Sequence, residues 1–186
     1  MSDAHLTQLL TQRREISADV VNVDEPLHQL VLVQIGDQSF AFLGKHIREI
    51  LVRPTVYFVP GCPESMEGVI NLRGSIESVI RLHGLLQVAS QSASDQSGFV
   101  LMGETEQLTS GIRVEALIDM IEVVESGLQP PPSSLPIHLT PYVSHIVSYQ
   151  HKPVAVLSLQ QLFADYAQIK SSILNPVLPR YRLCQS

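Results

Sequence analysis

One stretch of the sequence, residues 66–86, constrains the fold more than any other. Two segments rich in branched aliphatic residues, 69–72 and 76–82, flank a single cation and a glycine, Arg73-Gly74. Short apolar segments bounded by turn residues are typical of strands in a sandwich or barrel. An arginine in such a setting must turn outward or be paired, and a glycine beside it permits a positive φ. The stretch therefore predicts a β-hairpin that displays one charge at its bend.

Composition limits the classes of protein that this chain can belong to. Its 186 residues suit one domain or two small ones, with 45% hydrophobic and 16% charged residues and a net charge of −6. No basic run of five or more residues occurs, so we expect no nucleic-acid partner. The apolar segments fall short of the roughly 18 residues that span a bilayer, so we expect no direct membrane insertion. The chain has only two cysteines, Cys62 and Cys184, which are far apart, and its N-terminus lacks a signal-peptide pattern. Both observations favour the reducing cytoplasm as the location of the protein.

The remaining elements follow from periodicity and from turn residues. Residues 1–19 are interpreted as a short helix or a loose arm within an N-terminal extension, 1–26, and 169–186 as a C-terminal tail. The segment 90–98 is small and polar and predicts an exposed loop. The best helix is 158–169, with Ser158 as its N-cap. Strands are expected at 30–35, 39–43, 45–52, 55–59, 99–102, 111–117, 118–124, 142–149 and 154–157, and a helical turn at 82–87.

The chain also resembles itself. In the first half, residues 32–37 are followed by a hairpin and then by Ile47-Arg48-Glu49-Ile50. The second half repeats this order with residues 99–104, a hairpin and residues 117–121. In the same way, the pattern of 69–86 recurs at 143–163. Two halves of similar plan predict a mainly β protein of two packed five-stranded barrels with a few short helices. We expect the barrels to occupy about 27–90, with a crossover, and 99–168.

Catalytic and metal-binding constellations find little support in the sequence. The seven histidines are scattered, with neither a His-x-x-x-His pair nor a Cys-x-x-Cys pair, so no metal is expected. Glycine loops for phosphates or dinucleotides are also missing, so no cofactor is expected. Cys62, in Pro60-Gly61-Cys62-Pro63, is the one candidate nucleophile, and a small cytoplasmic enzyme that uses it stays an alternative. A small apolar filler is the favoured interpretation of this cysteine, and we expect no enzyme.

Interaction surfaces are the remaining kind of site. Arg73 at its bend, with Ile47 and Ile50 beside Glu49, fits an apolar strip with a polar rim, and arginine is favoured in binding hot spots. For the two isoleucines, a place in the core is an equally good interpretation. For Arg73 a solvated turn is less attractive, because this arginine interrupts an otherwise apolar stretch.

The segment Gly68-Val69-Ile70-Asn71-Leu72-Arg73-Gly74 resembles the signature of the CheW family, the coupling proteins of bacterial chemotaxis arrays. The resemblance extends over about 27–168. It implies two intertwined, SH3-like five-stranded barrels without catalysis. It also implies a cytoplasmic scaffold, located at receptor arrays, that joins the cytoplasmic tip of chemoreceptors to the regulatory domain of a CheA-type histidine kinase.

Site residues are carried over from the family by position in the motif. Those implied to face the receptor are Arg73, Asn71, Leu72, Ile47, Glu49 and Ile50. Edge residues of the first barrel are implied to meet the kinase, without an assignment to single positions.

Four positions depart from the pattern of the family. A proline and an aspartate that usually follow the signature are replaced by Ser78 and Arg81, a glycine of a late strand by His145, and an acidic or amide residue before the last helix by Ser158. Replacing an acid by Arg81 reverses a charge, so its partner must differ. The departures indicate a divergent member, serving twitching motility or phototaxis by analogy. The alternative is a decoy paralogue that binds only one partner.

Overall fold

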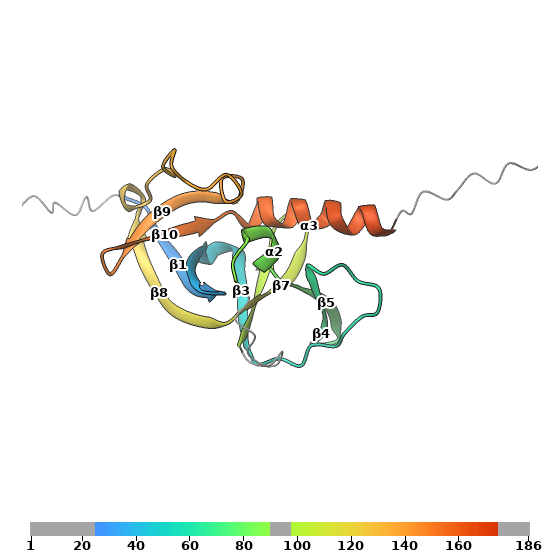
Figure 1. Cartoon of the computed structure of the whole chain (residues 1–186). Helices are drawn as coiled ribbons and strands as arrows, with labels where there is room; N and C mark the ends of the chain where they lie inside the picture. Colours follow the sequence, from blue (N-terminus) through green and yellow to red (C-terminus); the bar gives the residue numbers. More distant parts are fainter. Residues whose placement is uncertain (1–24, 90–97, 175–186) are drawn as a thin grey trace, which may run out of the picture.

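The computed structural model describes residues 25–89 and 98–174, with side chains described as far as residue 168. These residues form two curled five-stranded sheets and few helices, which confirms the mainly β double-barrel fold expected from the sequence (Figure 1). In chain order the elements are β1 (Leu27–Ile35), β2 (Gln38–Leu43), η1 (Gly44–His46), β3 (Ile47–Val52), β4 (Met66–Leu72), β5 (Ser75–Ile80), α2 (His83–Leu86), β6 (Phe99–Glu104), β7 (Thr109–Val114), β8 (Ala116–Val124), η2 (Glu125–Gly127), β9 (Val143–Tyr149), β10 (Lys152–Leu157) and α3 (Leu159–Leu174).

The two sheets share one topology. The first barrel has the order β8-β1-β2-β10-β9, and the second has the order β3-β6-β7-β5-β4. Each contains one parallel pair, β2 with β10 and β5 with β7, among antiparallel neighbours. In each half of the chain, a hairpin is followed by a strand that crosses to the other sheet, namely β3 after β1–β2 and β8 after β6–β7. We call this arrangement the strand exchange.

The strand exchange corrects the expected division of the barrels at residues 27–90 and 99–168. The first barrel joins β1 and β2 to β8, β9 and β10, and the second joins β3, β4 and β5 to β6 and β7. Each barrel therefore takes strands from both halves of the chain. The reason is that β3 and β8 each complete the sheet of the opposite hairpin rather than that of their own.

The core consists of three clusters, because alternate residues of a strand face opposite sides. On β1, Val31 and Val33 face a large cluster that also contains the buried residues of α3, whereas Leu30 and Leu32 belong to a cluster with β9 and β10. A third, smaller cluster around Ile70 joins β4, β5 and β6. The large cluster contains residues of both barrels and so joins them.

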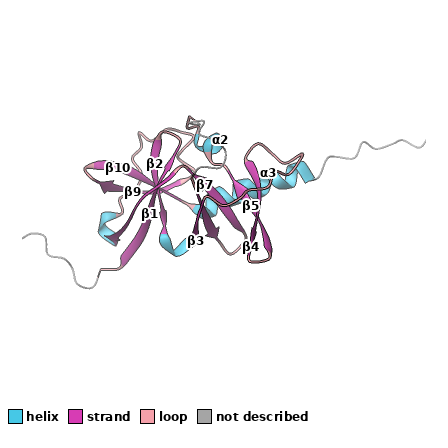
Figure 2. Ribbon diagram, turned by 90° about the horizontal axis from the view of Figure 1, so that it is seen from below, coloured by secondary structure: helices cyan, strands magenta, loops and turns pink. Residues whose placement is uncertain are grey.

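Helix α3 lies along the second barrel and covers the large cluster (Figures 1 and 2). Its N-cap is Ser158, as predicted, with the Gln161 N–H donating to Ser158 Oγ at 3.4 Å. The helix continues to Leu174 rather than ending at 169, and so extends into the expected tail. Its described apolar face, Leu159, Leu162, Phe163 and Tyr166, is buried.

A hydrogen bond ties α3 to the segment that leads into β9. The Tyr142 hydroxyl donates to Asp165 Oδ2 at 2.8 Å. Burial and this bond raise the pKa of Tyr142 from its ordinary value of 10.0 to about 12, because both disfavour the phenolate.

The strand expected at 55–59 is wrong. This segment makes a single β-bridge, between Tyr57 and Val69 at the edge of β4. The flanking prolines, Pro54 and Pro60, lack the N–H that a ladder requires. The interpretations of residues 1–19 and of the loop at 90–97 lie outside the described residues.

Candidate functional site

The hairpin β4–β5 places Arg73 at one end of the second barrel. Leu72 pairs with Ser75, so only Arg73 and Gly74 form the turn. Their φ angles are 52° and 93°, and two positive values are the mark of a type I′ turn, whose twist matches that of the flanking strands. Gly74 has open space around its missing Cβ, so its backbone conformation and not crowding requires the glycine. The predicted hairpin and its displayed arginine are confirmed.

The arginine pairs with the opposite edge strand of the same sheet. Arg73 Nη2 lies 3.1 Å from Glu49 Oε2, and the Arg73 side chain is 81% exposed. Because β3 and β4 stand at the two ends of the strand order, this ion pair spans the open side of the second barrel. The first barrel has a counterpart, in which the Tyr149 hydroxyl of β9 donates to Asp119 Oδ2 of β8 at 2.8 Å.

The other residues implied to face a partner have mixed surroundings. Asn71 is exposed, and its Oδ1 accepts the Gly74 N–H at 2.9 Å. Leu72 packs on the cluster around Ile70, and Ile47 and Ile50 pack on the large cluster, all three only partly buried. The structure thus brings Arg73, Glu49 and Asn71 together. The two isoleucines and Leu72 have packing roles, and a partner-binding role for the six stays a prediction.

An exposed isoleucine beside this site was missed by sequence reasoning. Ile76 is 74% exposed and pairs with Asn71 across the hairpin. Directly opposed residues of antiparallel strands share a face, so Ile76 extends the surface around Asn71. The apolar character of residues 76–82 gave no indication that this isoleucine meets solvent. The polar Ser75, Glu77 and Ser78 were the signal, because they gather at the turn end of the strand, which is its exposed end.

The charge-reversed position Arg81 has a partner that the sequence did not indicate. Its Nε donates to Glu67 Oε2 at 3.2 Å. Arg113 Nε shares its one N–H between the two oxygens of Glu67, at 2.8 and 3.1 Å, and Arg113 Nη2 donates to Oε1. Glu67 and Arg113 are each 7% exposed, so one buried carboxylate serves two guanidinium groups. A second of the four departures, Ser78, bonds to buried Ser110 through their hydroxyls at 2.9 Å.

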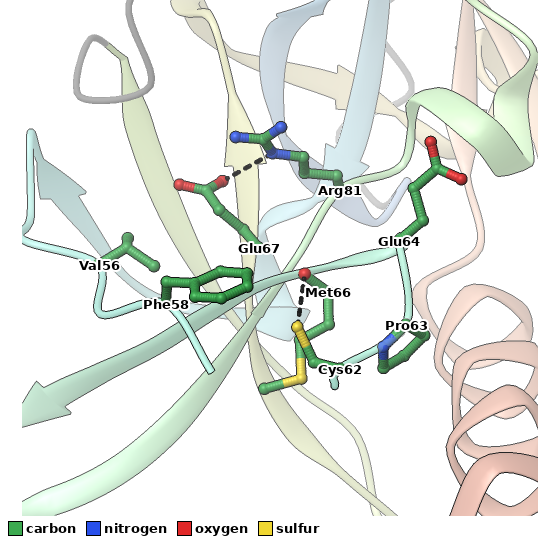
Figure 3. A pocket seen from close by; sticks show the side chains of 8 residues that line it. All are labelled: Val56, Phe58, Cys62, Pro63, Glu64, Met66, Glu67 and Arg81. Atoms are coloured by element: carbon green, nitrogen blue, oxygen red, sulfur yellow. Dashed lines mark hydrogen bonds and ion pairs between the residues drawn. The ribbon is translucent and has the colours of Figure 1, made fainter. Parts of the chain in front are cut away.

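Cys62 lies in a cavity of about 400 Å³ beside β4 (Figure 3). Its Sγ contacts the Met66 carbonyl oxygen at 3.5 Å. No histidine is among the residues that line the cavity, which are Val56, Phe58, Cys62, Pro63, Glu64, Met66, Glu67 and Arg81. The ionisable members of this lining are Cys62, Glu64 and the paired Glu67 and Arg81. Across the described ranges, 25–89 and 98–174, no cluster of three or more His, Cys, Asp or Glu is placed to hold a metal ion.

The strand exchange and the hairpin that displays Arg73 define the class of this protein, a double β-barrel whose barrels each take strands from both halves of the chain. The chain belongs to the CheW-like domain family, whose model matches residues 29–167. The part of the chain that the structure describes has no helix long and apolar enough to cross a membrane.

Curated relatives and a solved structure agree with this assignment. The chain is similar to the chemotaxis protein CheW of Treponema pallidum, with 27% identity over 147 residues, covering 77% of this chain and 86% of the relative. It is also similar to the probable chemotaxis protein CheW of Rhizobium etli, with 24% identity over 150 residues, covering 81% and 96%. The scaffolding protein TtCheW of Thermoanaerobacter tengcongensis has the same fold, with a TM-score of 0.65, 24% identity, and 72% and 90% coverage.

Proposed function

We propose that this protein is a non-catalytic coupling adaptor located in the cytoplasm at receptor arrays. It joins the cytoplasmic tips of chemoreceptors to the regulatory domain of a CheA-type histidine kinase. Membership of the CheW-like family supports this role, and the surface around Arg73 is the receptor-facing site. The observation that carries the site is the exposed guanidinium of Arg73 at the end of a two-residue hairpin, oriented by Glu49.

The conformation of Arg73 supports a role in binding rather than in folding. A residue other than glycine in the left-handed region costs on the order of 1 kcal/mol, and asparagine is the favoured residue at this place in a type I′ turn. The exposed ion pair with Glu49 stabilises the fold by between zero and about 1 kcal/mol. Stability therefore gives little reason for an arginine here. A guanidinium with five donors does give one, because it can bind carboxylates or carbonyls of a partner.

The neighbouring residues complete the proposed site. Ile47, Ile50 and Leu72 keep part of their surface exposed beside the charged pair. Apolar surface with an arginine at its rim is typical of protein interfaces. The receptor segment would therefore place apolar side chains on this strip and an acceptor near Arg73.

Substitution of Arg73 tests the proposal. We expect Arg73→Glu to weaken binding of a purified receptor tip at least tenfold, measured by calorimetry, and to leave binding of the kinase regulatory domain unchanged. A tenfold change corresponds to about 1.4 kcal/mol. Arg73→Asn should lose the same binding and unfold at an equal or higher temperature, because asparagine suits the turn.

Arg48→Glu is the matched control, because Arg48 is also exposed, lies on strand β3 and pairs with exposed Glu104. It should bind the receptor tip like the unsubstituted protein. Unchanged receptor binding by Arg73→Glu, or loss of its fold, would refute the proposed role of Arg73.

A decoy that binds one partner is the second candidate, favoured by the altered Arg81–Glu67 cluster beside the signature hairpin. The same measurements decide between the two, because a decoy binds either the receptor tip or the kinase domain but not both. Service in twitching motility or phototaxis is the narrower form of the proposal. Deletion of the gene should then abolish that movement and spare swimming.

A further inference from the structure

We infer that Asn71 is a positioning residue, whose side chain holds the turn that presents Arg73, and not a contact to the partner. This inference rests on the proposed function, since it concerns the same surface. It changes the role that the family resemblance implies for Asn71, which is direct binding.

The inference depends on one hydrogen bond, which joins residues on either side of Arg73. The Gly74 N–H donates to Asn71 Oδ1 at 2.9 Å, so the side chain of the residue two before Arg73 holds the residue that follows it. Side-chain oxygens of asparagine stabilise turns in this manner. Within the closed turn Arg73 keeps its φ of 52°, and from there its guanidinium reaches Glu49.

The hairpin of the other barrel provides an internal comparison. β9 and β10 are joined by Gln150 and His151, again a two-residue turn with positive φ at both positions, 48° and 61°. Ser148 stands at the place of Asn71, and in the described part of the chain it makes no hydrogen bond to the turn. A hairpin of this type therefore forms here without such a bond. In the β1–β2 hairpin Gln34 stands at this place, and its side chain instead donates to the Gly36 carbonyl oxygen at 3.0 Å. Of these three described hairpins, only that of Arg73 has a side-chain oxygen that accepts the N–H of the second turn residue.

Loss of the bond should act on binding through the conformation of Arg73. Without the acceptor, the turn samples other backbone conformations and the guanidinium leaves Glu49 for part of the time. The apparent affinity for a partner falls in proportion to the fraction of molecules in the binding conformation.

Two substitutions of Asn71 in the full chain separate positioning from contact. Asn71→Asp keeps the acceptor oxygen and removes the amide donors, whereas Asn71→Ala removes both. The readouts are water exchange of the Gly74 amide by NMR, in the free protein, and calorimetric affinity for a purified receptor tip. Ser148→Ala is the matched control and should change neither.

We expect Asn71→Ala to speed exchange of the Gly74 amide about tenfold and to weaken receptor binding about fivefold, the size of effect that one hydrogen bond supports. Asn71→Asp should keep the exchange rate of the Gly74 amide and the receptor affinity within about twofold of those of the unsubstituted protein. The inference is overturned if Asn71→Ala leaves Gly74 exchange unchanged. It is also overturned if Asn71→Asp binds as weakly as Asn71→Ala while Gly74 stays protected, because the amide donors then contact the partner.

Failure of the proposed function has a different signature. If Arg73→Glu keeps full receptor binding, the receptor-facing site is elsewhere, and the exchange rate of the Gly74 amide in the free protein still decides whether Asn71 holds the turn.

Discussion

Two arginines of this protein meet glutamates in opposite environments. The Arg73–Glu49 pair lies at the surface, where an ion pair contributes between zero and about 1 kcal/mol. Arg113 and Glu67 are each 7% exposed, and a buried charge that loses its partner costs several kcal/mol. The first pair is therefore suited to binding, whereas loss of one partner from the second should destabilise the fold.

Glu67→Gln is expected to lower the free energy of unfolding by about 3 kcal/mol, because Arg113 would remain buried without a counter-charge. Urea denaturation measures the change. Glu104→Gln is the control, since Glu104 and its partner Arg48 are half-exposed, and its effect should stay below about 0.5 kcal/mol. Equally small effects of the two substitutions would contradict a structural role for the Glu67 cluster.

Among the elements, α3 determines how the two barrels are held together. It begins directly after β10 of the first barrel and lies against β6 of the second. At Gly103 of β6 an added Cβ would stand 2.8 Å from Leu159 Cδ2 and 3.0 Å from Phe163 Cζ, so the glycine allows the close approach of the helix. The bond from Tyr142 to Asp165 fixes the opposite face of α3.

This bond predicts a loss of stability at high pH. The pKa of Tyr142 is raised from 10.0 in the unfolded chain to about 12 in the folded protein, so its contribution is complete below pH 10.0 and decreases as pH rises through 12. Urea denaturation between these values should show a slope that Tyr142→Phe reduces. The exposed Tyr57 supplies the control Tyr57→Phe, which should keep the slope. An unchanged slope in Tyr142→Phe would contradict the assignment.

At the scale of the whole molecule, the strand exchange makes each barrel depend on both halves of the chain. Pairings such as Leu27 with Val124 join residues that are far apart in sequence. The large cluster also contains residues of both barrels. We therefore expect a single cooperative unfolding transition rather than one for each barrel.

Fragments 25–89 and 98–174 are accordingly expected to remain unfolded when produced separately. The first lacks β8 and β10, which flank the β1–β2 hairpin, and the second lacks β3 and β5, which flank β6–β7. Circular dichroism and NMR chemical-shift dispersion measure the folded structure of each fragment and of their equimolar mixture. The mixture should regain the spectrum of the intact chain. A fragment that unfolds cooperatively by itself would contradict the interdependence of the halves.

Local features of the fold were predictable from sequence, whereas pairings between distant segments were not. The Arg73 hairpin and the Ser158 cap depend on neighbouring residues, and both were predicted correctly. The partnership of Glu67 with Arg113, 46 residues away, has no local signal. Repetition indicated two similar barrels, but nothing local to β3 states which hairpin it joins. The binding roles of Ile47 and Ile50 depend on a partner and stay predictions.

The strand exchange also fixes the order in which the protein can be completed during its synthesis. The strands of the second barrel are all present once Val114 has been made, whereas the β1–β2 hairpin must wait for β10, which ends at Leu157. At about 5–20 residues per second, this hairpin spends several seconds with Val31, Phe40 and Phe42 uncovered, side chains that the finished protein buries completely. The first of the described strands to emerge from the ribosome are thus among the last to be protected, and are where a nascent-chain chaperone would be needed most.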